Sequence, residues 1–389
     1  MTLLLAVIYA AFISLGLPDA VVGASWPSLA PSLHADPAGA GIISMIVCIG
    51  TITASFASVA LLRRFGTVKI SITSVALTAV TLLGYSVAPS FLWLCILALP
   101  LGLGAGAIDA AINAFVSLNY STRHNNWLHA FWGVGASLGP LIVGFWLNWR
   151  AQWRPAYVTV ALLQFALMFL LIASRKLWEG VEHAATPDDF SHDDAVAQLS
   201  PWYRLPHITP ILCGFFLYCA VELTTGLWGA TFLVQYHHIC PSLAAAGSAG
   251  FYIGITVGRF IAGFAAEKFS NLVLLRVGSA IIVTGAVVSL LSPFAVGAVA
   301  GFIMIGLGCA PIYPVILKET ARRLGAANTQ RAMGLQMGFA YTGQLLMPPA
   351  VGYLMTRIDP VLMPVFVLLG TGAMIACHEY VEKAVMKNK

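Results

Sequence analysis

The sequence has 389 residues, of which 59% are hydrophobic and only 9% are charged, and its net charge is +5. Soluble domains carry about 25% charged residues, so this composition excludes a soluble enzyme and indicates that lipid surrounds most of the chain. The basic residues lie in short loops between apolar runs, which argues against a nucleic-acid partner. The seven cysteines show no spacing typical of metal ligands, so we expect neither a metal site nor a cofactor.

Apolar runs of membrane-spanning length follow one another along the whole chain. They cover residues 3–26, 40–62, 68–88, 92–119, 127–148, 155–175, 207–236, 243–266, 271–291, 294–318, 331–356 and 361–381. The connections are short except for the acidic stretch 176–206, which contains three prolines. The sequence therefore predicts an all-α integral membrane protein with twelve transmembrane helices. Six of them form a bundle at 1–175 and six a bundle at 207–389, joined by a linker at 176–206.

The basic residues also predict the orientation. If the N-terminus is cytoplasmic, only Arg150, Arg154 and Arg357 of the 20 Lys and Arg residues fall on the outer side. Cytoplasmic loops carry an excess of basic residues, so both termini and the linker are expected in the cytoplasm. We expect a multi-pass monomer in the bilayer of the inner membrane.

One carboxylate, Asp109, lies in the middle of the run 92–119. A charged side chain near the bilayer centre costs at least about 2.5 kcal/mol, so such a residue is a functional candidate. Asn113 follows one helical turn later on the same face, and His129 and Trp132 lie on the next run. An apolar environment opposes ionisation of a carboxylate, which allows it to bind a proton reversibly. The alternative is a structural carboxylate that accepts hydrogen bonds from neighbouring donors.

The two halves of the chain repeat each other at offsets of 203 to 208 residues. The matched residues are Asp19 with Glu222, Gly102 and Gly104 with Gly306 and Gly308, and Gly135 and Pro140 with Gly343 and Pro348. Parallel repeats with a substrate site between them near the bilayer midplane are a known transporter plan. The repeat makes Glu222 the counterpart of Asp19.

Several stretches carry a family resemblance: FISLGLPDAVVGASWP, GLGAGAIDAAINAF, NWLHAFWGVGASLGP, LYCAVELTTGLWGATFL, GRFIAGFAAEKF, GLGCAPIYPVIL and GFAYTGQLLMPPAVGYLM. In these the chain resembles the major facilitator superfamily, and within it the fucose permease and sugar symporter group. The resemblance implies proton coupling through acidic residues on the first and fourth helices, which here are Asp19 and Asp109. With Glu222 added from the repeat, these three are the predicted ion-coupling residues.

Sugar recognition needs polar groups for the ring hydroxyls and aromatic faces for the ring itself. The predicted substrate-binding residues are Asn113, His129, Trp132, Trp228, Tyr313, Gln336, Tyr341 and Gln344. The alternative for each aromatic side chain is helix packing or contact with lipid.

The loop after the second run, ALLRRFGTVKI, keeps the basic residues and the glycine of the superfamily's cytoplasmic loop signature but lacks its acidic residue. The resemblance implies gating roles for Arg63 and Arg64. In the second half it implies the same for Arg259, Glu267 and Lys268, with Glu267 near Arg259.

The favoured hypothesis is a secondary transporter that couples a sugar or similar small polar solute to a H⁺ or Na⁺ gradient by alternating access. Gly135, Gly139 and Pro140 also resemble the helix-five signature of antiporters, so a drug or metabolite:proton antiporter is the alternative. The sequence has no phosphate-binding loop and no nucleophile motif. We therefore do not expect an enzyme or an ATP-driven pump.

Overall fold

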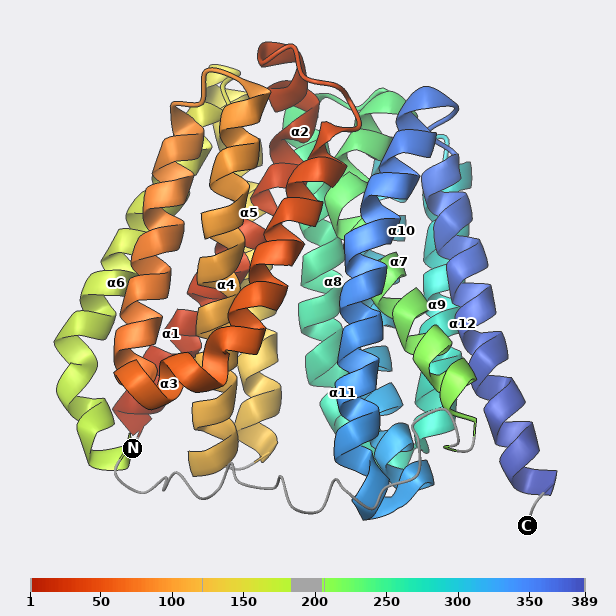
Figure 1. Ribbon diagram of the computed structural model, residues 1–389. Coiled ribbons are helices and arrows are strands. Elements are labelled where there is room, and N and C mark those ends of the chain that lie inside the picture. The colour runs from red at the N-terminus through yellow and green to blue at the C-terminus, as the bar shows by residue number, and fades with distance from the viewer. Residues whose placement is uncertain (1, 121, 183–204, 206, 388–389) are drawn as a thin grey trace. The chain divides into compact units, whose positions relative to one another are not determined.

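The computed structural model describes residues 2–120, 122–182, 205 and 207–387, and every regular element within them is an α-helix (Figure 1). The elements are α1 Thr2–Asp19, α2 Val21–Ser32, α3 Gly39–Ser86, α4 Phe91–Asn119, α5 Thr122–Arg150, α6 Arg154–Glu182, α7 Ile208–Gln235, α8 Pro241–Lys268, α9 Asn271–Leu291, α10 Ala295–Cys309, α11 Ile312–Arg357 and α12 Leu362–Lys387. Ten helical stretches in the described part of the chain are long and apolar enough to cross a membrane. The all-α membrane architecture is therefore confirmed.

Ten such stretches are found for the twelve predicted runs because two expected boundaries are not helix ends. The runs 40–62 and 68–88 both lie in α3, which is interrupted only at Gly66 with φ 76° and ψ 163°. Glycine tolerates this positive φ because it has no Cβ, and Figure 1 shows α3 turning at one end of the bundle. The run 331–356 forms the later part of α11 and is not among the ten stretches. Twelve spans remain a prediction.

Two further boundaries are corrected by the structure. The first apolar run does not end at residue 26 but continues to Ser32, with a break between α1 and α2. The helix expected at 155–175 extends to Glu182, so the first residues of the predicted linker are helical. Residues 183–204 and 206 lie outside the described residues, and the domain boundaries 1–175, 176–206 and 207–389 stay a prediction.

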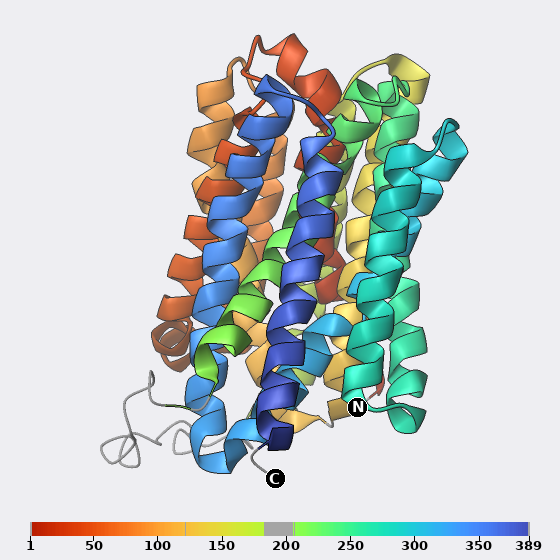
Figure 2. The same ribbon diagram turned by 90° about the vertical axis from the view of Figure 1, so that its right-hand side faces the viewer.

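The described residues divide into two compact units. The N-terminal unit holds α1–α6 together with Cys240–Ala249, and the C-terminal unit holds α7, the rest of α8 and α9–α12. In the N-terminal unit α1 packs on α5 and α3 packs on α4 and α6. In the C-terminal unit α7 packs on α11, and α12 lies along α7 and α9 (Figure 2). Each unit has its own helix-on-helix core.

The internal repeat is present as matching backbone contacts in the two units. Gly102 of α4 lies against the backbone of Val47 in α3, and Gly306 of α10 lies against the backbone of Phe251 in α8. Both residues of the second contact are 204 positions after those of the first. A Cβ at either glycine would overlap a backbone carbonyl, so the small residue permits the close helix approach.

The same correspondence holds for α1 with α5 and for α7 with α11. Gly135 lies against the backbone of Ile13, and Gly343 lies against the backbone of Phe216. Ile13 and Phe216 are 203 residues apart, which is the offset that relates Asp19 to Glu222. The repeat found in the sequence therefore describes equivalent helix contacts within each unit.

Candidate functional site

The first membrane-spanning segment is broken at Asp19, where α1 ends and α2 begins at Val21. The preceding residue, Pro18, has no N–H to donate to the carbonyl of Ser14 four residues earlier. That carbonyl instead accepts a 2.6 Å hydrogen bond from Nε2 of Gln164 in α6, and the Ser14 hydroxyl donates to Oε1 of the same amide. Gln164 thus satisfies the backbone group that Pro18 leaves unbonded, one turn before Asp19.

Helix α5 brings Trp132 to this break. The indole Nε1 of Trp132 donates a hydrogen bond to Oδ2 of Asp19 at 2.7 Å. The two helices approach closely because Gly16 of α1 lies against the backbone of Trp132 and Gly135 of α5 lies against that of Ile13. Asp19 is exposed and Trp132 is half-buried. Two residues predicted from the sequence as ion-coupling and substrate-binding are therefore in direct contact.

The second carboxylate of the N-terminal unit, Asp109, is half-buried in α4. Nδ2 of Asn113 donates to its Oδ1 at 2.8 Å and to its backbone carbonyl at 3.0 Å. Asp109 lies within electrostatic range of Asp19. Among the described residues neither carboxylate belongs to an ion pair. The side-chain donors that they do have, Trp132 for Asp19 and Asn113 for Asp109, are uncharged.

The third predicted ion-coupling residue, Glu222 of α7, has a cationic neighbour. Nη2 of Arg259 in α8 lies 4.0 Å from its Oε1, and the two side chains are 17% and 18% exposed. Arg259 was expected near Glu267, which lies eight residues and about 12 Å further along the same helix. The acidic side chain beside Arg259 in the structure is therefore that of Glu222 in α7 and not the expected Glu267. The equivalent carboxylates Asp19 and Glu222 have different partners, an indole and a guanidinium.

Aromatic rings gather on the helix that carries Glu222. Tyr218 lies one turn before Glu222 and donates its hydroxyl hydrogen to the carbonyl of Cys309 at 3.1 Å. The Tyr313 ring of α11 lies 6.2 Å from the Tyr218 ring and 5.2 Å from that of Phe215, measured between centroids. Tyr313, a predicted substrate residue, is half-buried in this cluster.

Two predicted substrate residues are fully buried inside the C-terminal unit. The Trp228 indole donates to the carbonyl of Pro348 at 2.7 Å, and its ring lies against Gly352 of α11. Nε2 of Gln336 donates to the hydroxyl of Thr320 at 2.9 Å. In this conformation Trp228 fills the contact between α7 and α11, so its indole face is not available to a solute.

The other sequence-predicted residues are more accessible. His129, Tyr341 and Gln344 are half-buried, and the His129 ring meets Phe12 edge-on at 5.8 Å between centroids. The predicted gating residues Arg63, Arg64, Glu267 and Lys268 are exposed at helix positions beside the Gly66 break and at the end of α8.

Sequence reasoning missed two polar contacts of α1. Gln164 is a buried amide within the apolar run 155–175, and its polarity in that run was a usable signal. The hydroxyl of Tyr9 lies 2.8 Å from Nδ1 of His124 and joins α1 to α5. These two residues are 115 positions apart, and no motif connects them.

The comparison with protein families decides the broad class. The model of the Major Facilitator Superfamily matches residues 8–238 and, a second time, residues 210–382. The chain belongs to this superfamily. It is accordingly a multi-pass membrane protein and a secondary transporter of a small-molecule substrate.

Relatives within the superfamily are distant. Bypass of stop codon protein 6 of Saccharomyces cerevisiae is 25% identical over 278 residues, which cover 66% of this chain and 56% of the yeast protein. The glucose/mannose transporter GlcP of Bacillus subtilis is 20% identical over 314 residues, covering 79% of this chain and 77% of GlcP. These identities do not assign the fucose permease subgroup.

Solved structures of the superfamily show the same fold. The crystal structure of the nucleoside transporter NupG superposes with a TM-score of 0.76 at 11% sequence identity. The likeness covers 97% of this chain and 98% of that one.

Proposed function

We propose that this transporter moves a sugar or a similar small polar solute by alternating access and couples that movement to a proton gradient. The observation that carries the proposal is Asp19, an exposed carboxylate at a helix break, in contact with Trp132 and within electrostatic reach of Asp109.

The position of Asp19 favours a path filled by water or solute. It lies within the membrane-spanning stretch Leu3–Ser32, yet its side chain is exposed. A carboxylate facing lipid costs several kcal/mol, whereas non-helical backbone at membrane depth is tolerated where it lines a cavity. The face of the N-terminal unit that carries Asp19 is therefore the face that we assign to transport.

The chemistry of this face suits a polyhydroxylated solute. Asp19 and Asp109 supply acceptors, Asn113 supplies an amide, and Trp132 supplies a flat aromatic surface. Ring hydroxyls bind such acceptors and amides, and the apolar face of a sugar ring packs on aromatic side chains. The similarity to a protein named as a glucose/mannose transporter supports a hexose as the first solute to test.

The surroundings of the two carboxylates favour H⁺ over Na⁺. When both are ionised, Asp19 and Asp109 repel each other, and a proton bound by either one removes that repulsion. Trp132 and Asn113 donate N–H groups to these carboxylate oxygens, so a Na⁺ ion would have to displace these donors to bind there. We therefore assign proton coupling to Asp19 and Asp109.

The glycines of the antiporter-like motif in α5 have a structural explanation, so they do not favour an antiporter over a symporter. Gly135 and Gly139 lie against the backbones of Ile13 and Leu17, so close packing of α5 on α1 explains both glycines. The same residues serve a symporter equally well.

Uptake by proteoliposomes tests the proposal. The purified chain is reconstituted, and accumulation of radiolabelled glucose, mannose, fucose and a nucleoside is measured with an imposed proton gradient, an imposed sodium gradient or neither. We expect one of the sugars to accumulate only with the proton gradient directed into the vesicle. Accumulation driven by sodium, or by an outward proton gradient as in antiport, contradicts the proposal.

A further inference from the structure

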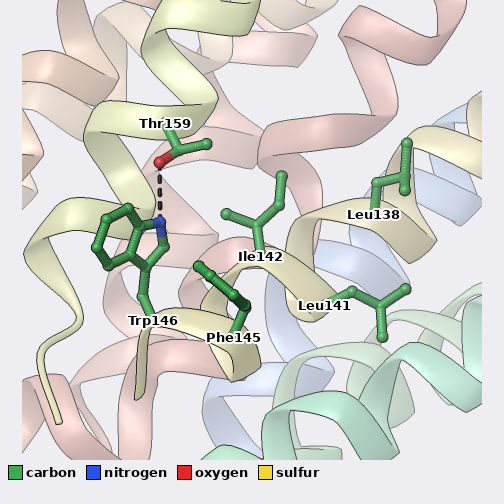
Figure 3. Close-up of a pocket in the computed structure, with 6 residues that line it drawn as sticks. All are labelled: Leu138, Leu141, Ile142, Phe145, Trp146 and Thr159. Atoms are coloured by element: carbon green, nitrogen blue, oxygen red, sulfur yellow. Dashed lines mark hydrogen bonds between the residues drawn. The ribbon is translucent and has the colours of Figure 1, made fainter. Parts of the chain in front are cut away.

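The N-terminal unit has an apolar groove of about 310 Å³ lined by α5 and α6, and none of its lining residues is one of those assigned to transport (Figure 3). Its lining residues are Leu138, Leu141, Ile142, Phe145, Trp146 and Thr159. The two polar groups in this set bond to each other, since Trp146 Nε1 donates to Thr159 Oγ1 at 2.9 Å. The Thr159 hydroxyl in turn donates to the carbonyl of Pro155 at 2.9 Å. The groove therefore offers hydrocarbon contacts and suits an apolar occupant.

The groove leads to a cation through touching aromatic rings. The rings of Phe145 and Trp146 lie 5.8 and 5.2 Å from the ring of Trp149, measured between centroids. The guanidinium of Arg150 lies 4.7 Å from the centroid of the Trp149 ring. Arg150 is exposed and forms no ion pair within the described part of the chain. An apolar surface and a positive charge thus form one continuous strip.

The strip has the length of one lipid leaflet. From Leu138 to Arg150 is 12 residues of α5, or about 18 Å at 1.5 Å per residue. One leaflet contributes about half of the roughly 30 Å hydrocarbon thickness of a bilayer. Trp and Arg residues at the end of a spanning helix lie at the headgroup level, where Arg can pair with an anionic phosphate.

We propose that this strip is a binding site for one anionic phospholipid, with an acyl chain in the groove and the phosphate at Arg150. Apolar burial retains the chain, and charge pairing at Arg150 selects anionic over zwitterionic headgroups. The proposal does not depend on the identity of the transported solute.

The C-terminal unit provides a matched control. Arg357 at the end of α11 is 207 residues after Arg150, and its guanidinium lies 6.0 Å from the ring centroid of Tyr353. It combines a terminal arginine with an aromatic ring in the same way, and it does not line the groove between α5 and α6.

Native mass spectrometry of the full chain in detergent measures the binding. Phosphatidylglycerol and phosphatidylcholine with identical acyl chains are added to the parent protein and to three variants. Arg150→Gln removes the charge, Ile142→Trp fills the groove, and Arg357→Gln is the control. Thermal unfolding in the same detergent establishes that each variant is folded.

We expect the parent and Arg357→Gln to retain one tightly bound phosphatidylglycerol. Arg150→Gln should lose the preference for phosphatidylglycerol several-fold while still binding either lipid, and Ile142→Trp should retain one lipid fewer of both kinds. Unchanged selectivity in Arg150→Gln, or an unchanged number of lipids in Ile142→Trp, overturns the proposal. An equal loss of selectivity in Arg357→Gln also overturns it, because the preference then belongs to exposed charge in general. If Ile142→Trp alters only the unfolding midpoint, the groove is covered by protein instead of lipid.

Discussion

Trp132 of α5 donates its indole hydrogen to the carboxylate of Asp19, the last residue of α1, over 2.7 Å. This bond connects Asp19, which the sequence predicts as an ion-coupling residue, with Trp132, which it predicts as a substrate-binding residue. It also fixes the carboxylate at the only described break within the stretch Leu3–Ser32.

Trp132→Phe keeps an aromatic ring and removes the donor to Asp19. A hydrogen bond to a charged group contributes about 1.5 to 3 kcal/mol. Its loss releases the carboxylate that we assign to the solute, so we expect the half-saturating solute concentration in counterflow to rise by up to about tenfold. Trp93→Phe is the control, because Trp93 donates its indole hydrogen to the carbonyl of Gly84 on an exposed face. Equal half-saturation in Trp132→Phe and the parent contradicts a role for this bond in solute binding.

Gln164→Leu should destabilise the break in the first span. The substitution keeps most of the side-chain volume but leaves the carbonyl of Ser14 without the donor that replaces Pro18. An unsatisfied buried polar group costs about 1 to 3 kcal/mol, so the thermal unfolding midpoint in detergent should fall. Gln235→Leu, at an exposed position, should leave the midpoint nearly unchanged. A midpoint for Gln164→Leu equal to that of this control shows that the amide has no such role.

Trp228→Phe should lower stability and leave solute affinity unchanged. The variant loses the hydrogen bond to Pro348 and part of the packing on Gly352, and a typical neutral hydrogen bond contributes about 0.5 to 1.5 kcal/mol. Unfolding midpoint and counterflow half-saturation are measured on the same preparation. Weaker solute binding with an unchanged midpoint restores the substrate-binding role that the sequence predicts.

Local features of the sequence predicted the helical architecture and the internal repeat. Apolar runs determine where helices cross the membrane, and the small residues Gly102, Gly306, Gly135 and Gly343 are needed wherever two backbones approach. These constraints act at single positions and at a fixed offset, so they can be found in a chain without its structure. The proximity of Asp19 and Trp132 follows from Gly135 together with Gly16, because these two glycines bring α1 against α5.

Other properties depend on long-range packing and were not predicted. Trp228 occurs in a stretch that resembles a sugar transporter, yet its burial depends on how α7 meets α11. Helix ends were also misplaced at Gly66, because an apolar run does not indicate whether the next helix starts after a loop or after a single residue with positive φ. The partner of Arg259 was missed for the same reason, since Glu222 lies on another helix.

A double-mutant cycle tests the pair formed by Glu222 and Arg259. Either Glu222→Gln or Arg259→Gln removes this ion pair and keeps one of its two partly buried charges. Breaking a buried pair costs up to about 3 to 5 kcal/mol. We expect each single variant to unfold at a lower temperature and the double variant to recover part of that loss. Additive losses in the double variant show that the two side chains do not interact.

The central claim is that Asp109 and Asp19 couple solute movement to protons, and Asp109→Asn tests it most directly. The amide cannot carry a negative charge or release a proton at any working pH, but it keeps the size of the side chain. Proteoliposomes are assayed for proton-driven accumulation and for counterflow exchange of the same solute, with Asp36→Asn as the exposed control. We predict that Asp109→Asn loses accumulation and retains counterflow, while Asp36→Asn retains both. Proton-driven accumulation by Asp109→Asn equal to that of the parent contradicts the account and leaves Asp109 with a structural role.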